Sequence, residues 1–133
     1  MKSAFSLLEL IFAIVILGIV ASFAIPRFVD TKDSALVSTI RRDINTTINS
    51  VQSHYLLNGG IEKISDAVTV NLSNWNLENE DTKLTDKNGC LSLELTTSSS
   101  GSKVIDLKNT TKNSSICLKI RNSGIVDKIY ELF

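Results

Sequence analysis

One stretch decides the fold of this chain: residues 5–26, which read FSLLELIFAIVILGIVASFAIP. From Leu10 to Ile25 the stretch is apolar apart from Ser22. A helix needs roughly 20 such residues to cross a bilayer. We therefore predict a membrane-spanning helix over residues 5–25.

One acid, Glu9, lies near the start of this stretch. An ionised Asp near the centre of a spanning helix costs about 2.5–3.5 kcal/mol by insertion scales; the cost is smaller near the end, and Glu should behave similarly. A simple membrane anchor does not explain a carboxylate in this place. We expect Glu9 to have a role and a partner.

The segment from Ala4 to Glu9 resembles the processing site of type IV pilins and of the related pseudopilins of type II secretion and DNA-uptake machines. The resemblance implies that the leader, residues 1–4, is cut off after Ala4 and that the new amino group on Phe5 is methylated. It also implies a helix kink at Pro26. Ala4 departs from the family, which usually has Gly before the cut.

The resemblance also implies the role of Glu9, whose carboxylate meets the amine of Phe5 on a neighbouring subunit. Each charge alone is costly beside lipid, and together they neutralise one another and define the axial register between subunits. The alternative is an incidental acid near the membrane surface.

Three other interpretations of the N-terminal stretch remain open. A secretory signal peptide would use Lys2 and a cleavage site at Ser22-Phe23-Ala24. A core helix of a soluble protein or a plain single-pass anchor would also be apolar. Glu9 inside the apolar segment and Pro26 just past the cut argue against a signal peptide, and a plain anchor does not explain Glu9.

After Pro26 the helical pattern becomes amphipathic. Apolar residues recur at spacings of three and four, which predicts one buried stripe: Val37, Ile40, Ile44, Ile48, Val51 and Tyr55. Asn58-Gly59-Gly60 supplies a stop. We predict one long helix over about residues 5–57, whose second half belongs to an exported domain, residues 26–133.

The rest of the chain predicts a small antiparallel sheet. Alternation over 91–96 and 103–107 indicates two strands joined by a Ser/Gly turn, and residues 116–120 indicate a third. Residues 79–89 are expected to form a polar loop and 125–133 a fourth strand or a short helix. Trp75 is expected to be a core or lid aromatic rather than a platform for a ligand. The fold class is α+β, with the long N-terminal helix packed on three or four strands, as the resemblance also implies.

The two cysteines, Cys90 and Cys117, are expected to form one disulfide if the chain is exported to an oxidising compartment. The bridge would tie the first strand to the third and close a loop of about 28 residues, worth roughly 3 kcal/mol. Two buried free thiols are the alternative. With His54 distant they form no zinc site, and no grouping suggests an enzyme.

The formal net charge is zero, but its distribution is uneven. Residues 61–100 hold three basic and seven acidic groups (−4), whereas 101–133 hold six and three (+3). Opposite poles would help subunits select neighbours, although ordinary scatter gives such values too. The basic residues of the last third would contact DNA phosphates or cover a solvated sheet face: Lys103, Lys108, Lys112, Lys119, Arg121 and Lys128.

Two weaker patterns concern ligands and modification. Asp81, Asp86 and Asn88 offer oxygen ligands in one loop, which makes them weak calcium candidates; otherwise we expect no cofactor. Glycosylation triplets, more simply explained as polar surface, begin at four positions: Asn45, Asn71, Asn109 and Asn113.

Together these features predict a structural subunit of a type IV pilus or pseudopilus that serves type II secretion or DNA uptake. The resemblance implies a homo-oligomer or mixed filament, a prepilin peptidase, and an inner-membrane platform with its ATPase. It places the leader in the cytoplasm and the C-terminal domain in the periplasm. A membrane-tethered periplasmic binding module that does not polymerise is the alternative.

Overall fold

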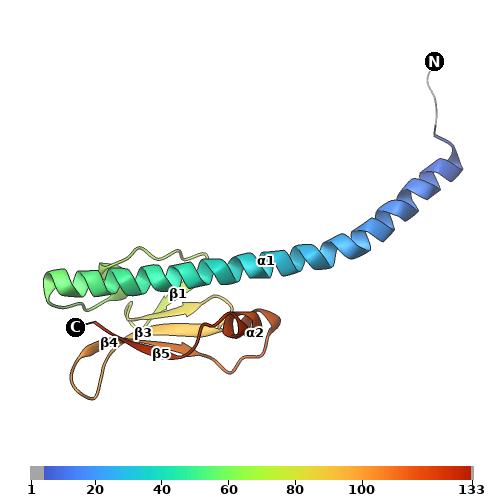
Figure 1. Ribbon diagram of the computed structural model, residues 1–133. Coiled ribbons are helices and arrows are strands. Elements are labelled where there is room, and N and C mark those ends of the chain that lie inside the picture. The colour runs from blue at the N-terminus through green and yellow to red at the C-terminus, as the bar shows by residue number, and fades with distance from the viewer. Residues whose placement is uncertain (1–4, 133) are drawn as a thin grey trace. The chain divides into compact units, whose positions relative to one another are not determined.

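The structure, a computed structural model, describes residues 5–132, so the predicted cleavage residue Ala4 and the leader lie outside it. The chain divides into two units, one ending at Ala35 and one beginning at Leu36. The helices and strands follow in this order (Figure 1): α1 Leu7–Asn58, the short 3-10 helix η1 Ile64–Asp66, β1 Trp75–Glu78, β2 Lys83–Asp86, β3 Leu91–Thr97, β4 Lys103–Asn109, α2 Ser115–Asn122 and β5 Lys128–Glu131.

Helix α1 confirms the prediction of one long N-terminal helix. It has 52 residues and continues through Pro26. Proline lacks a backbone donor, so the Ser22 carbonyl loses its usual partner at this point. Gly59 follows the helix with a φ of 75°, a left-handed conformation that glycine adopts readily.

The five strands form one antiparallel sheet in the order β1-β2-β3-β4-β5, so every strand pairs with its neighbour in the chain. The predicted strands at 91–96 and 103–107 are confirmed as β3 and β4, which pair over seven residues each. The predicted α+β arrangement of a long helix and an antiparallel sheet is therefore confirmed, with one strand more than expected.

The prediction of a strand at 116–120 is wrong, because this segment is the helix α2. The Ser114 hydroxyl accepts a hydrogen bond from the Cys117 amide and caps the helix N-terminus. Cys117 and Ile120, three residues apart, are its buried residues. In so short an apolar run, alternation cannot distinguish a strand from one face of a helix.

The prediction of a loop over 79–89 is wrong in part, since strand β2 lies within it. Leu84 is this strand's only buried hydrophobic residue, and two buried positions in four residues leave too little alternation to detect. Of the two possibilities for 125–133, the strand is observed as β5.

The core lies between the second half of α1 and one face of the sheet. The predicted stripe is buried from Val37 to Val51, and Tyr55 packs against its end. The stripe faces Leu91, Leu93 and Leu95 of β3 and the inward residues of β4, and α2 closes the same core. Figure 1 shows α1 lying along the sheet in this unit.

Trp75 confirms the prediction of a core aromatic, since only 2% of its surface is exposed. Its indole N–H donates a hydrogen bond of 2.9 Å to the Asp43 carboxylate on α1. A buried indole usually needs such a partner. The sequence did not reveal this contact, because Asp43 lies among the polar residues beside the apolar stripe.

Replacing Asp43 by Ala is expected to lower the free energy of unfolding by about 1–2 kcal/mol, because the buried indole N–H loses its acceptor. Thermal unfolding of the variants measures this. D43N keeps an oxygen acceptor and should lose less. With Trp75→Phe as background, D43A should have little further effect; an unchanged effect there would show that the contact does not stabilise the fold.

Candidate functional site

The first candidate site is the N-terminus of α1. The Ser6 hydroxyl accepts a hydrogen bond from the Glu9 amide at 3.2 Å, and the Ser6 carbonyl accepts one from Leu10 at 3.1 Å. Ser6 thus starts the helix, one residue after Phe5. Glu9 lies in the first turn, where the helix dipole favours a negative charge.

The Glu9 carboxylate is exposed, and no described residue of the chain donates a hydrogen bond to it. Its backbone is held by Ser6, while its side chain is left available. Glu9 is also the only ionisable side chain between Phe5 and Pro26. A cation brought by another molecule would therefore find one defined anionic position in this apolar stretch.

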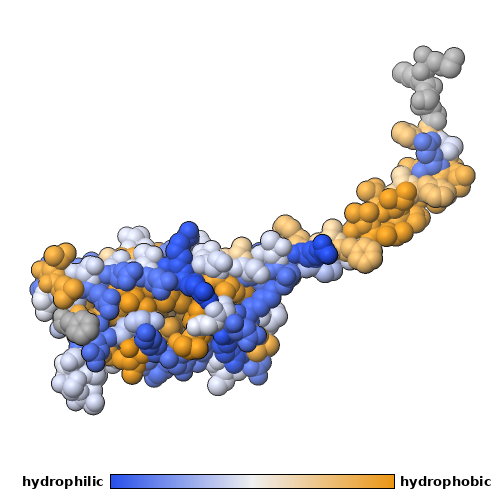
Figure 2. All heavy atoms as spheres, in the orientation of Figure 1, coloured by the Kyte–Doolittle hydropathy of each residue, from blue (hydrophilic) through white to orange (hydrophobic). Residues whose placement is uncertain are grey.

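Between Leu7 and Ile25, α1 exposes all of its large apolar side chains, and Figure 2 shows apolar residues over most of the visible face of this stretch. Its most apolar 18-residue window has a mean hydropathy of 2.7, and none of that window is buried within the chain. By length and composition this is the one helix among the described residues that could cross a membrane. A helix that is apolar all round requires lipid or other helices around it.

Two small residues of this segment bear on packing. The Ser22 hydroxyl donates to the Ile19 carbonyl at 2.7 Å, so the helix satisfies its own polar group. An added Cβ at Gly18 would meet nothing within 4 Å. The chain's own packing therefore does not require glycine there, whereas a neighbouring helix could approach closely at such a position.

The second feature is the disulfide bridge between Cys90 and Cys117, whose Cα atoms lie 5.0 Å apart. Both residues are buried in the core. Because residues 116–120 are helical, the bridge ties the start of β3 to α2 rather than one strand to another. It fixes the helix that interrupts the connection from β4 to β5.

The weak calcium candidates do not converge. Asp86 is buried, and its carboxylate accepts backbone hydrogen bonds from Cys90 at 2.6 Å, Leu91 at 2.9 Å and Asn88 at 3.2 Å. Asp81 accepts from the Ser65 hydroxyl at the other end of β2, and a strand of this length separates the two carboxylates by more than about 10 Å. No group of three or more metal-binding His, Cys, Asp or Glu occurs among residues 5–132.

Asp86 therefore holds the turn into β3, and Asp86→Ala is expected to lower the free energy of unfolding by about 2–3 kcal/mol. The loss should be the same in calcium and in a chelator, as measured by denaturant unfolding. Lys87→Ala, a change at the exposed neighbour, serves as control. If calcium stabilises the unaltered protein and this stabilisation disappears in D86A, Asp86 would instead be a calcium ligand.

The basic residues of the last third do not gather on one face. On β4, Lys103 and Lys108 point to opposite faces of the sheet, as odd and even positions do. Lys108 pairs with Asp106 at 3.0 Å, and this hydrogen bond raises the pKa of Lys108 above its ordinary value. Lys112 and Arg121 donate to backbone carbonyls.

The glycosylation triplets differ in exposure. Asn45, Asn71 and Asn113 are exposed, and Asn45 lies within α1. The Asn109 amide donates to the Ile125 carbonyl and to Asp127, so it holds the end of β4 against the segment before β5. The asparagine at position 109 therefore has a structural role, which explains its presence without glycosylation.

Comparison with known protein families gives one match. Residues 1–25 of the 133 match the family model described as prokaryotic N-terminal methylation motif. The comparisons with curated proteins and with solved structures found no match. The matched segment contains both Phe5 and Glu9.

Proposed function

We propose that this chain is a structural filament subunit assembled from a membrane. The premise is that it carries the methylation motif, which is the signature of type IV pilins and pseudopilins. The observation that supports this most strongly is the pairing of the matched motif with an exposed helical stretch, residues 7–25, that is apolar apart from Ser22 and the free carboxylate of Glu9. Such a helix fits a lipid environment before assembly and a bundle of like helices after it.

The proposed processing generates the partner for Glu9. Cleavage after Ala4 frees an amine on Phe5, which is methylated and remains cationic. In a filament this amine meets the Glu9 carboxylate of an adjacent subunit in a low-dielectric interior. Each charge alone there would be strongly unfavourable, so helices slipped out of register are disfavoured.

The remaining architecture fits this role. Residues 5–25 would form the filament interior, and the α+β domain would lie outside it. The leader would stay in the cytoplasm and the domain would lie in the periplasm, where the bridge from Cys90 to Cys117 is stable. The peptidase, the platform and its ATPase are supplied by other proteins, and this chain acts as a structural subunit rather than an enzyme.

Mass spectrometry of the chain produced with and without a prepilin peptidase tests the proposal. We expect a mature N-terminus at Phe5 with one added methyl group, only when the peptidase is present. A4G, which restores the residue common in the family, should be processed at least as fast. Cleavage after Ala24 would instead support a secretory signal peptide and contradict the proposal.

Deleting the gene distinguishes the two machines that such a subunit would serve. DNA uptake and protein secretion are followed in the same cultures. Loss of uptake alone assigns the subunit to a transformation pilus, and loss of secretion alone assigns it to a type II secretion pseudopilus. Loss of neither contradicts both assignments.

A further inference from the structure

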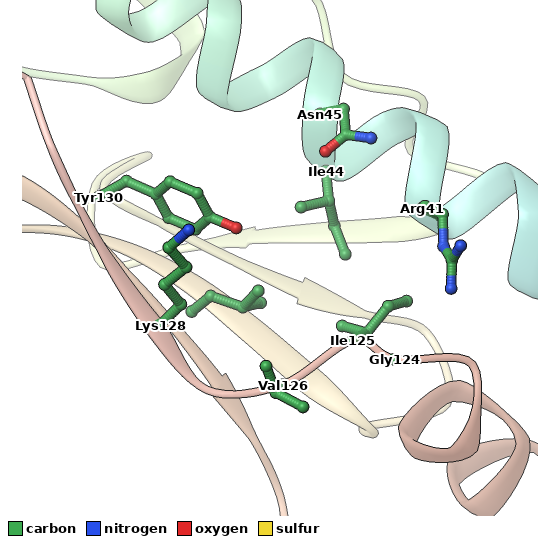
Figure 3. A pocket seen from close by; sticks show the side chains of 9 residues that line it. Arg41, Ile44, Asn45, Gly124, Ile125, Val126, Lys128 and Tyr130 are labelled. Atoms are coloured by element: carbon green, nitrogen blue, oxygen red, sulfur yellow. The ribbon is translucent and has the colours of Figure 1, made fainter.

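A basic groove lies between α1 and the segment that leads into β5. A cavity of about 290 Å³ is lined by Arg41, Asn45, Lys128 and Tyr130 over an apolar floor (Figure 3). A second cavity shares Arg41 and Asn45 with it and adds Arg42. We call the two together the basic groove.

The groove carries three positive charges and, among the described residues that line it, no acid. Arg41 donates to the Ser123 carbonyl, and Lys128 lies 5.0 Å from the centre of the Tyr130 ring. Neither contact neutralises a charge. Arg42 and Lys128 are exposed, so a carboxylate could reach them without displacing a partner acid.

A complementary acidic turn connects β1 with β2. Glu78 and Glu80 are exposed there, and Asp81 follows them. The Asp81 carbonyl accepts from the Ile64 amide at 2.9 Å, and the Asp81 carboxylate accepts from Ser65. The turn is thus held in place, and little ordering entropy would be lost when it binds.

Lys128 of the groove and the acidic turn lie at opposite edges of one sheet, since β5 and β1 are its terminal strands. Four strand spacings separate them by roughly 19 Å. Lys128 is therefore too far from the turn of its own molecule to pair with it, whereas two molecules can join groove to turn. When each molecule gives its groove to one neighbour and its turn to another, the contact is heterologous, and it propagates as an open polymer where its rotation does not close a ring.

We infer that the basic groove receives the acidic turn, residues 78–81, of a second copy of this chain, and that this contact links the domains along the filament. The inference rests on the proposed function. Charge complementarity is expected to select and orient the neighbour, while packing of the apolar helices supplies most of the association free energy.

Charge exchange in the full-length protein tests the contact. Arg42→Glu and Glu80→Lys are each expected to lower the yield of sheared filaments at least about fivefold, because like charges then face one another. The double variant R42E/E80K should restore most of the yield. K87E, a charge reversal at an exposed lysine outside the groove, should assemble normally, and equal thermal unfolding of all four variants shows that the domain is intact.

A double variant that assembles no better than either single change would overturn the contact, as would full assembly of both single variants. In that second case filaments still form, so the proposed function stands. If the unaltered chain forms no filaments with its peptidase and platform present, the proposed function fails and the contact fails with it.

Discussion

Replacing Glu9 by Ala is expected to abolish filament assembly while the protein remains in the membrane. Removing one member of a buried ion pair costs on the order of 3–5 kcal/mol, which corresponds to a decrease of more than about 100-fold in the association constant of each subunit contact. The yield of sheared filaments measures assembly, and fractionation of the cells measures membrane retention.

The physical reason lies in the environment of the first half of α1. Residues 10–25 are apolar apart from Ser22, and the large apolar side chains among them are exposed, so the variant keeps its affinity for lipid. The Phe5 amine of each neighbour, however, would enter the bundle without an anion. Because Ser6 holds the backbone of this turn, the substitution should leave the helix itself in place.

Two variants serve as controls for this result. Ser22→Ala removes the other polar side chain between Leu7 and Ile25, which bonds to a carbonyl of its own helix, and should assemble normally. Glu9→Gln keeps the shape without the charge and should fail as E9A does. Normal filaments from E9A would contradict the proposed ion pair, and a chain that never forms filaments but stays tethered would fit the periplasmic binding module.

The long helix and two central strands were predictable because their patterns are long. The stripe from Val37 to Val51 repeats over four turns, and alternation in the sequence covers 91–96 of β3 and 103–107 of β4. Repetition of this length averages out local exceptions. Both regions match their predicted residues to within about two positions.

The short elements were not predictable, because tertiary contacts decide them. Helix α2 has eight residues, and its Ser114 cap and its bridge to Cys90 select helix over strand. Strand β2 has four residues and depends on pairing with strands on both sides. The basic groove combines residues from α1 and β5 that lie more than about 80 positions apart in the sequence, so no local pattern reveals it.

The role of Asp86 shows a similar limit for polar residues. In the sequence, Asp86 is one of several oxygen-bearing side chains near Gly89 and resembles a metal ligand. In the structure, its carboxylate accepts three backbone amides and is buried. Residue type alone does not distinguish an acid that binds a cation from one that completes a turn.

The second large effect concerns the bridge. Replacing both Cys90 and Cys117 by Ser is expected to lower the free energy of unfolding by roughly 3–4 kcal/mol, because the bridge closes a loop over a sequence separation of 27. For a domain of about 100 residues, this corresponds to a fall in Tm of at least about 10 °C. Thermal unfolding of the full chain in detergent measures it.

Reduction supplies the matched control, since the unaltered chain in a strong reductant should unfold near the temperature of the double variant. The bridge holds α2 in the connection between β4 and β5, so its loss should loosen this end of the domain first. Hydrogen exchange should therefore rise most in α2 and β5, while the amides of β3 and β4 stay protected. Equal Tm values with and without the bridge would show that the packing of Ile120 and its neighbours alone holds α2 in place.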